Sequence, residues 1–145
     1  MNTIKQRTFS LVIGCGRLGA GIAGALSDEN QDVTVIDVDK TSFRKLPPSY
    51  GGLTISGSAT DMNVLSEAGI QQADNIIIVT DIDNINICAA QMAKVLFHVN
   101  NVVVRVYDKE KAELLNGMDI NIICPSVLSE TEISHFVTLG GEKNV

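Results

Sequence analysis

The stretch "LVIGCGRLGAG", Leu11–Gly21, decides the fold. Its apolar run leads directly into Gly14, Gly16 and Gly19, which fit the pattern G-x-G-x-x-G. Glycine costs conformational entropy on folding, so several glycines close together indicate a backbone that turns sharply or approaches another group. In a strand–turn–helix unit the first glycine allows the tight turn, the second lets the backbone approach a pyrophosphate, and the third lets the helix pack on the sheet.

Asp37 completes this pattern. It ends the next apolar run, Asp32–Asp37, about 20 residues further on, where a carboxylate accepts the hydroxyls of an adenosine ribose. A carboxylate favours an unmodified 2′-hydroxyl and repels the 2′-phosphate of NADP. The residues therefore leave NAD(H), ATP, ADP and AMP open as ligands and disfavour NADP.

Arg17 is the one charged residue of the opening stretch. A cation in the first turn of a helix opposes the helix dipole, so it either neighbours an anion or is a solvated surface residue. Phosphate is a suitable anion for a guanidinium group. Cys15 lies inside the loop, where we interpret it as a small side chain and not as a redox centre.

Six short apolar runs predict strands that are covered on both faces. Helix-like segments lie between them, and the first of these is expected over Arg17–Ser27. The pattern predicts an α/β fold with a doubly wound, parallel, six-stranded Rossmann-like sheet of order 3-2-1-4-5-6. The predicted strands are Thr8–Ile13, Asp32–Asp37, Leu53–Ser56, Asn75–Thr80, Asn101–Val106 and Asn121–Cys124.

Capping residues predict where the shorter helices begin and end. Asp39 can cap a short helix that ends before Pro47, and either Thr60 or Asp61 can begin the helix "MNVLSEA". Gly69 then ends that helix.

The later helices carry two further predictions. In "DIDNINICAAQMAKVLF" one helical face is expected to be core. The segment "KEKAELLN" ends at Gly117, and Ser129 with Glu132 forms a capping box that is expected to open a last helix, "TEISHFVTL". The apolar residues of that last helix are expected either to be buried by a second copy or to fold back on the sheet. The expected core face of the earlier helix is Ile85, Cys88, Ala89, Met92 and Leu96.

Two further loops follow strands and therefore lie at the ligand-binding edge of such a sheet. They are Gly57–Asp61 and Thr80–Asn84. Their side chains either bound a pocket for adenine or a second ribose, or simply cap helices. The predicted ligand-binding residues are Gly14, Cys15, Gly16, Arg17, Leu18, Gly19, Asp37, Val38, Asp39, Ser58, Ala59, Thr80 and Asp81.

Composition narrows the class of protein. The chain has 145 residues, which suits one domain, expected over residues 1–138 with a flexible tail at 139–145. A net charge of −6 without a basic cluster argues against binding to nucleic acid or directly to lipid. Three unpaired cysteines and an N-terminus without an apolar signal segment indicate a cytoplasmic protein. Neither histidine has a second ligand at metal-binding spacing, so no metal site is expected.

Four segments together resemble one family over almost the whole chain. They are "VIGCGRLG", "VTVIDVD", "GSATDMNVLSEAGIQQADNIIIVTDIDNIN" and "VVVRVYDKEKAELLNGMDINIICP". They are similar to the N-terminal nucleotide-binding domain of TrkA/Ktr-type potassium-uptake regulatory subunits, called RCK for regulator of potassium conductance. The resemblance implies binding of NAD(H) or ATP/ADP, contact between Arg17 and phosphates, a homodimer, and a ring on the cytoplasmic face of a potassium-translocating membrane protein.

The chain departs from that family at three places. Many relatives carry Asp or Asn where Ser58 stands, and some carry a metal-placing Glu where Ser126 follows Pro125. We therefore expect no metal at Ser126. Relatives usually continue into a smaller C-terminal domain, so the sequence is expected to be either a truncated or a single-domain version.

Two other functions require features that the sequence does not offer. An NAD-dependent oxidoreductase needs a substrate-binding region and a proton donor beside the nicotinamide, whereas the six strands and their helices occupy the chain. A redox-sensing transcription module needs a basic DNA-binding element, which the sequence lacks. We expect a regulatory module without catalytic residues, located at the inner face of the membrane through its partner.

Overall fold

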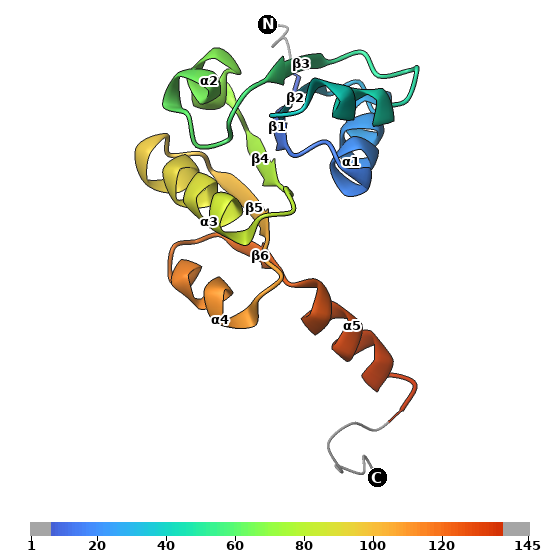
Figure 1. The fold of residues 1–145 in the computed structure, drawn as a ribbon, viewed down its shortest axis with the longest axis vertical. Coiled ribbons are helices and arrows are strands. Elements are labelled where there is room, and N and C mark those ends of the chain that lie inside the picture. The colour runs from blue at the N-terminus through green and yellow to red at the C-terminus, as the bar shows by residue number, and fades with distance from the viewer. Residues whose placement is uncertain (1–6, 138–145) are drawn as a thin grey trace, which may run out of the picture.

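The computed structural model describes residues 7–137, which form one parallel sheet with helices on both faces (Figure 1). The strand order is β3-β2-β1-β4-β5-β6, so the predicted fold class and order are confirmed. The strands are β1 Phe9–Ile13, β2 Asp32–Asp37, β3 Leu53–Ser56, β4 Asn75–Ile78, β5 Asn101–Arg105 and β6 Asn121–Ile123. The α-helices are α1 Arg17–Asp28, α2 Met62–Glu67, α3 Asp83–Gln91, α4 Lys109–Ala112 and α5 Pro125–Ser134.

Short turns of other helix types complete the secondary structure. Three are 3₁₀ turns, η1 Lys40–Lys45, η2 Ile70–Gln72 and η4 Glu113–Leu115. The fourth, η3 Met92–Leu96, is a π-helical turn that continues α3. None of the helices in residues 7–137 has the length and apolar character needed to cross a membrane.

Alternate side chains of β1 enter two separate cores, one on each face of the sheet. Val12 packs with α1 and η1 on one face. Leu11 and Ile13 pack with α2 and α3 on the other. Burial on both faces explains why the central strands are apolar along their length instead of alternating.

Asparagines tie the amino ends of the later strands together. Asn75 donates to the Ser10 hydroxyl at 3.0 Å, and Asn101 donates to the Asn75 side-chain oxygen at 2.8 Å. Asn121 continues the series by donating to Asn101 at 3.0 Å. These polar contacts lie at the start of the strands, so the opposite edge, where the strands end, remains available for a site.

The glycine loop joins β1 to α1 as the sequence predicts. Gly14 has φ +101°, a conformation that side chains rarely adopt, and it makes the tight turn. Gly19 lies directly against that turn, because a Cβ built on it would stand 1.7 Å from the Gly14 carbonyl oxygen. The helix can therefore approach the sheet only with glycine at this position.

The capping predictions hold for the short helices. Asp39 accepts a hydrogen bond from the Thr41 N–H at 2.9 Å and begins η1. Of the two candidates, Asp61 is the residue that caps α2, accepting from the Asn63 N–H at 2.9 Å. Gly69 follows Ala68, the C-cap residue of α2, and has φ +88°.

The predicted start of the last helix is wrong. α5 begins at Pro125, four residues before Ser129, so the proposed capping box lies inside the helix. Proline has its φ fixed near the helical value and needs no N–H in the first turn, so it starts a helix well. α5 has no buried residue and extends away from the sheet (Figure 1). The predicted tail, 139–145, lies outside the described residues.

The predicted core face of α3 is only partly right. Ala89 is buried, and Ile85 and Met92 pack against the core, but Cys88 and Leu96 are exposed. The buried face instead includes Asn86, Ala90 and Ala93. An apolar pattern misses Asn86 because its burial depends on hydrogen bonds, and the π-turn shifts the residues that follow Gln91.

Candidate functional site

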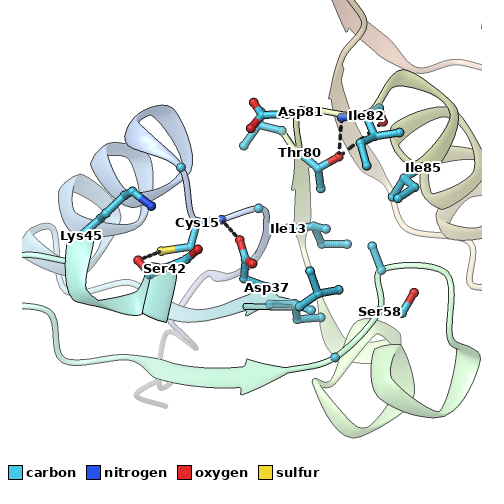
Figure 2. A pocket seen from close by; sticks show the side chains of 17 residues that line it. Ile13, Cys15, Asp37, Ser42, Lys45, Ser58, Thr80, Asp81, Ile82 and Ile85 are labelled. Carbon is cyan, nitrogen blue, oxygen red and sulfur yellow. Dashed lines mark hydrogen bonds between the residues drawn. The ribbon is translucent and has the colours of Figure 1, made fainter. Parts of the chain in front are cut away.

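A cavity of about 260 Å³ lies at the carboxyl ends of β1, β2 and β4 (Figure 2). Its walls come from the glycine loop, the end of β2, η1, the loop after β3 and the segment after β4. In open parallel sheets ligands bind at this edge, where the strand order reverses. Between β1 and β4 the order of this sheet reverses, so the cavity occupies the expected position for a ligand.

Most of the predicted binding residues line this cavity. Arg17, Leu18, Gly19 and Asp39 are outside its lining. Arg17 is exposed, Gly19 is buried beneath the loop, and Asp39 caps η1. Contact of any of these residues with a ligand stays a prediction. The predicted residues that line the cavity are Gly14, Cys15, Gly16, Asp37, Val38, Ser58, Ala59, Thr80 and Asp81.

Several residues of the cavity wall are not among the predicted ligand-binding residues. Ser42 and Lys45 enter from η1, and Ile82 and Ile85 enter from the start of α3. The spacing of Ser42 and Lys45 is a signal that could have predicted them together, because residues three apart in a 3₁₀ turn lie on the same side. Ile82 and Ile85 reach the cavity because of the direction in which α3 leaves β4. No local sequence pattern predicts that direction.

Asp37 holds the glycine loop to the end of β2. One carboxylate oxygen accepts the Cys15 N–H at 2.8 Å, and the other accepts the Asp39 N–H at 2.9 Å. A carboxylate offers about four acceptor positions, so each oxygen can still accept a ribose hydroxyl. Asp37 thus positions the loop and keeps acceptor capacity toward the cavity.

Cys15 forms a neutral part of the wall. Its thiol donates to the Ser42 carbonyl oxygen at 3.4 Å (Figure 2). Burial raises the pKa of the Cys15 thiol, the Asp37 carboxylate raises it further, and Lys45 lowers it in part. The thiol therefore stays protonated near neutral pH, which favours a packing role over a nucleophilic one.

Asn86 fixes the opposite wall. Its amide oxygen accepts hydrogen bonds from the Thr80 N–H and hydroxyl, and its amide nitrogen donates to the Thr80 and Arg105 carbonyl oxygens at 2.9 Å each. The Arg105 guanidinium also donates to the Val79 carbonyl oxygen at 3.0 Å. These bonds hold the segment after β4 against β5, so Thr80 lies in a fixed position at the cavity.

The start of α1 offers donors to an anion. Gly16 is the N-cap, and no side chain among the described residues caps this helix. Its first N–H groups and the positive end of its dipole are therefore available to a phosphate. The cavity combines apolar walls, a carboxylate and this anion-binding helix end, which together suit a nucleotide.

In residues 7–137 no three His, Cys, Asp or Glu side chains are grouped to hold a metal ion.

Comparison with known proteins identifies one family. The profile of the TrkA-N domain matches residues 10–125. A Trk system potassium uptake protein TrkA from Streptomyces coelicolor is 43% identical over 110 residues, which are 76% of this chain and 49% of that protein. The chain thus spans about half the length of this relative.

Solved structures of the GsuK channel have the same fold. The structure bound to ADP has a TM-score of 0.72 and 23% identity, covering 89% of this chain and 33% of that one. The structure bound to NAD has a TM-score of 0.68 and 21% identity, covering 86% of this chain and 22% of that one.

Proposed function

This chain belongs to the TrkA-N domain family, and on that basis we propose that it is the nucleotide-binding regulatory part of a potassium uptake system. An adenine nucleotide in the cavity would control a membrane potassium-translocating partner. The observation that carries this proposal is the Asp37 carboxylate, hydrogen-bonded at 2.8 Å to the glycine loop on the cavity wall. The potassium uptake in the names of its relatives supports this physiological role.

We propose NAD(H) or ATP/ADP as the ligand and exclude NADP. Asp37 would accept the 2′- and 3′-hydroxyls of the ribose, and the apolar side chains of Val38 and Ala59 would contact the adenosine. A 2′-phosphate would bring negative charge next to the Asp37 carboxylate, whose oxygens already accept two N–H groups. The ADP and NAD named for the GsuK structures support an adenine nucleotide in general.

Control of a partner requires that the nucleotide bind two assembly states unequally. Hydrogen bonds lead from the cavity toward α5 and support this mechanism. Asp83, at the start of α3, accepts the Tyr107 N–H at 2.8 Å. The Tyr107 carbonyl oxygen in turn accepts the thiol of Cys124, the N-cap of α5, at 3.6 Å. A ligand that shifts the start of α3, where Asp83 lies, would therefore act on α5.

We propose that the chain is not an enzyme. The alternative, an NAD-dependent oxidoreductase domain, requires a group that exchanges a proton with substrate beside the nicotinamide. Cys15 is a poor candidate because its pKa is raised, and Asp37 is engaged by two N–H groups. These features support a binding role for the cavity.

We propose a homodimer, within a larger ring, that reaches the inner face of the membrane through its partner and without direct lipid contact. The exposed apolar residues of α5 and the segment after it support dimerisation, since Phe136 is 82% exposed and Ile133 is 51% exposed. Apolar surface of this kind is usually buried by a partner. The net charge of −6 supports the absence of direct lipid binding.

Sedimentation tests the dimer. At tens of micromolar we expect the wild type to sediment as a species larger than its 15.5 kDa chain, and Phe136→Asp to shift it toward the monomer. Val95→Asp changes another side chain that is 58% exposed and serves as the control. A single 15.5 kDa species for the wild type would contradict the proposed dimer.

Rubidium uptake tests the proposed function in cells. In the source organism, deletion of this protein should change the rate of uptake, and the wild-type gene should restore it. Asp37→Ala should restore it poorly at equal protein level, whereas Glu110→Ala, which removes an exposed carboxylate from α4, should act like the wild type. Uptake that is unaffected by the deletion would contradict the proposal.

A further inference from the structure

Lys45 lies between two hollows of the surface. It lines the cavity described above, and it also lines a groove of about 740 Å³ between α1 and η1. Arg17, Gly21 and Gly24 form the α1 side of this groove, with Pro47 on the other side. Within residues 7–137 Lys45 is the one residue common to both linings. A ligand that extends from the cavity into the groove would therefore pass Lys45.

The position of Lys45 follows from how η1 is anchored. Asp39 caps this 3₁₀ turn, while Phe43 and Leu46 pack into the core beneath α1. The Ser42 carbonyl oxygen accepts the Cys15 thiol, which connects η1 to the glycine loop. Lys45 lies on the same side of the turn as Ser42 and reaches toward the loop (Figure 2).

The two cations at this point lack a carboxylate partner. Among residues 7–137 no carboxylate oxygen lies within 4.0 Å of the Lys45 ammonium or the Arg17 guanidinium. Both lie on the groove that follows α1 from its N-terminal residue, where the helix dipole is positive. The groove lining also contains one carboxylate, Asp28, but this residue ends α1, whereas Arg17 begins it. Positive charge therefore gathers at the N-terminal end of the helix, where it attracts an anion.

The charge of Lys45 also acts inside the cavity. It lowers the pKa of the Cys15 thiol, against the larger effects of burial and of Asp37. The ammonium is therefore close enough to the glycine loop to interact with a charge held there. A phosphate bound at the N-terminus of α1 would therefore interact with the charge of Lys45 and with that of Arg17, the first residue of the helix.

We propose that Lys45 binds the terminal phosphate of ADP or ATP and makes this site select nucleoside di- and triphosphates over NAD. This inference rests on the proposed adenine-nucleotide function. The phosphate chain leaves the cavity past Gly16 and enters the groove between Lys45 and Arg17. A terminal phosphate has one ester or anhydride bond and carries close to two negative charges near neutral pH. Each phosphate of NAD has two such bonds, because a nucleoside esterifies both phosphates, and carries one negative charge. Cations without carboxylate partners therefore favour the terminal phosphate.

Titration calorimetry on the Lys45→Gln variant tests this role. We expect ADP and ATP to bind about 10- to 100-fold more weakly than to the wild type, because a charge-assisted contact is lost. Adenosine should bind within about twofold of the wild type, and NAD should lose less affinity than ADP. Lys40→Gln is the matched control, because Lys40 belongs to the same turn and lines neither hollow.

Arg17→Ala provides a second variant. It should weaken ATP more than adenosine, because the phosphate-bearing ligand alone loses a contact. Equal losses of affinity for adenosine and ATP in either variant would overturn the inference. It would also be overturned if Lys45→Gln lost the most affinity for NADP, because Lys45 would then contact the 2′-phosphate. Wild-type protein that binds NAD as tightly as ADP would also overturn it. If the wild type binds adenosine and ATP but Lys45→Gln is unchanged, the inference alone fails, whereas no binding of any adenine compound removes the proposed function as well.

Discussion

Asp37→Ala is expected to weaken the binding of ATP, ADP, NAD and adenosine by a similar factor, about 10- to 100-fold. All four ligands present the same ribose hydroxyls, and Asp37 is the carboxylate at the end of β2 that faces them. The substitution also removes the acceptor of the Cys15 N–H at 2.8 Å, which loosens the glycine loop. Titration calorimetry with the four ligands measures both contributions together.

Glu110→Ala is the control for Asp37→Ala, because it removes the same charge from an exposed position on α4. It should leave all four affinities within about twofold of the wild type. A loss confined to the phosphate-bearing ligands in Asp37→Ala would contradict the ribose assignment. It would mean that Asp37 acts through the loop and the phosphates instead.

Gly19→Ala is expected to destabilise the fold by about 3 kcal/mol or more. The added Cβ would stand 1.7 Å from the Gly14 carbonyl oxygen, which is backbone and cannot rotate away. α1 would have to move off the sheet, and its contacts with the core of Val12, Ala20 and Ala23 would be disturbed. Urea denaturation followed by circular dichroism gives the change in the free energy of unfolding.

Gly21→Ala is the matched control for this substitution. It lies in the same helix, and a Cβ built there meets nothing within 4 Å. Alanine should stabilise the protein at this position by roughly 0.5–1 kcal/mol through its higher helix propensity. If both substitutions changed the free energy of unfolding equally, the stability of the fold would not depend on the close approach of α1 to the turn at Gly14.

The sheet could be predicted because its determinants are local. Apolar runs of strand length, the turn at Gly14, and caps such as Asp39 and Asp61 each act within a few residues. The errors have two different causes. Asn86 is buried because it forms hydrogen bonds to Thr80 and Arg105, which are distant signals that an apolar pattern does not contain. At α5 two local signals compete, and the helix begins at Pro125 and not at the capping box of Ser129.

The residues of the site also divide into those that local sequence predicts and those that tertiary packing places. Residues at or just after the end of a strand, such as Asp37 and Thr80, could be predicted to line the cavity, because the strands end at one edge. Lys45 could not be predicted in this way. Its place depends on how Phe43 and Leu46 pack beneath α1, and that packing joins segments from different parts of the chain. The position of Lys45 at the cavity is therefore known from the structure and not from the sequence pattern.

A thermal-shift panel tests the central claim, that this domain binds an adenine nucleotide in its native state, most directly. The panel contains ATP, ADP, NAD, NADH and adenosine, with GTP for comparison, on wild type and Asp37→Ala. A ligand at about 100 times its Kd stabilises the native state by about 2.7 kcal/mol, which raises the Tm of a domain of this size by several degrees. We predict such a rise for at least one adenine nucleotide with the wild type and a much smaller rise with Asp37→Ala. No change in Tm with any adenine nucleotide at millimolar concentration would contradict the claim.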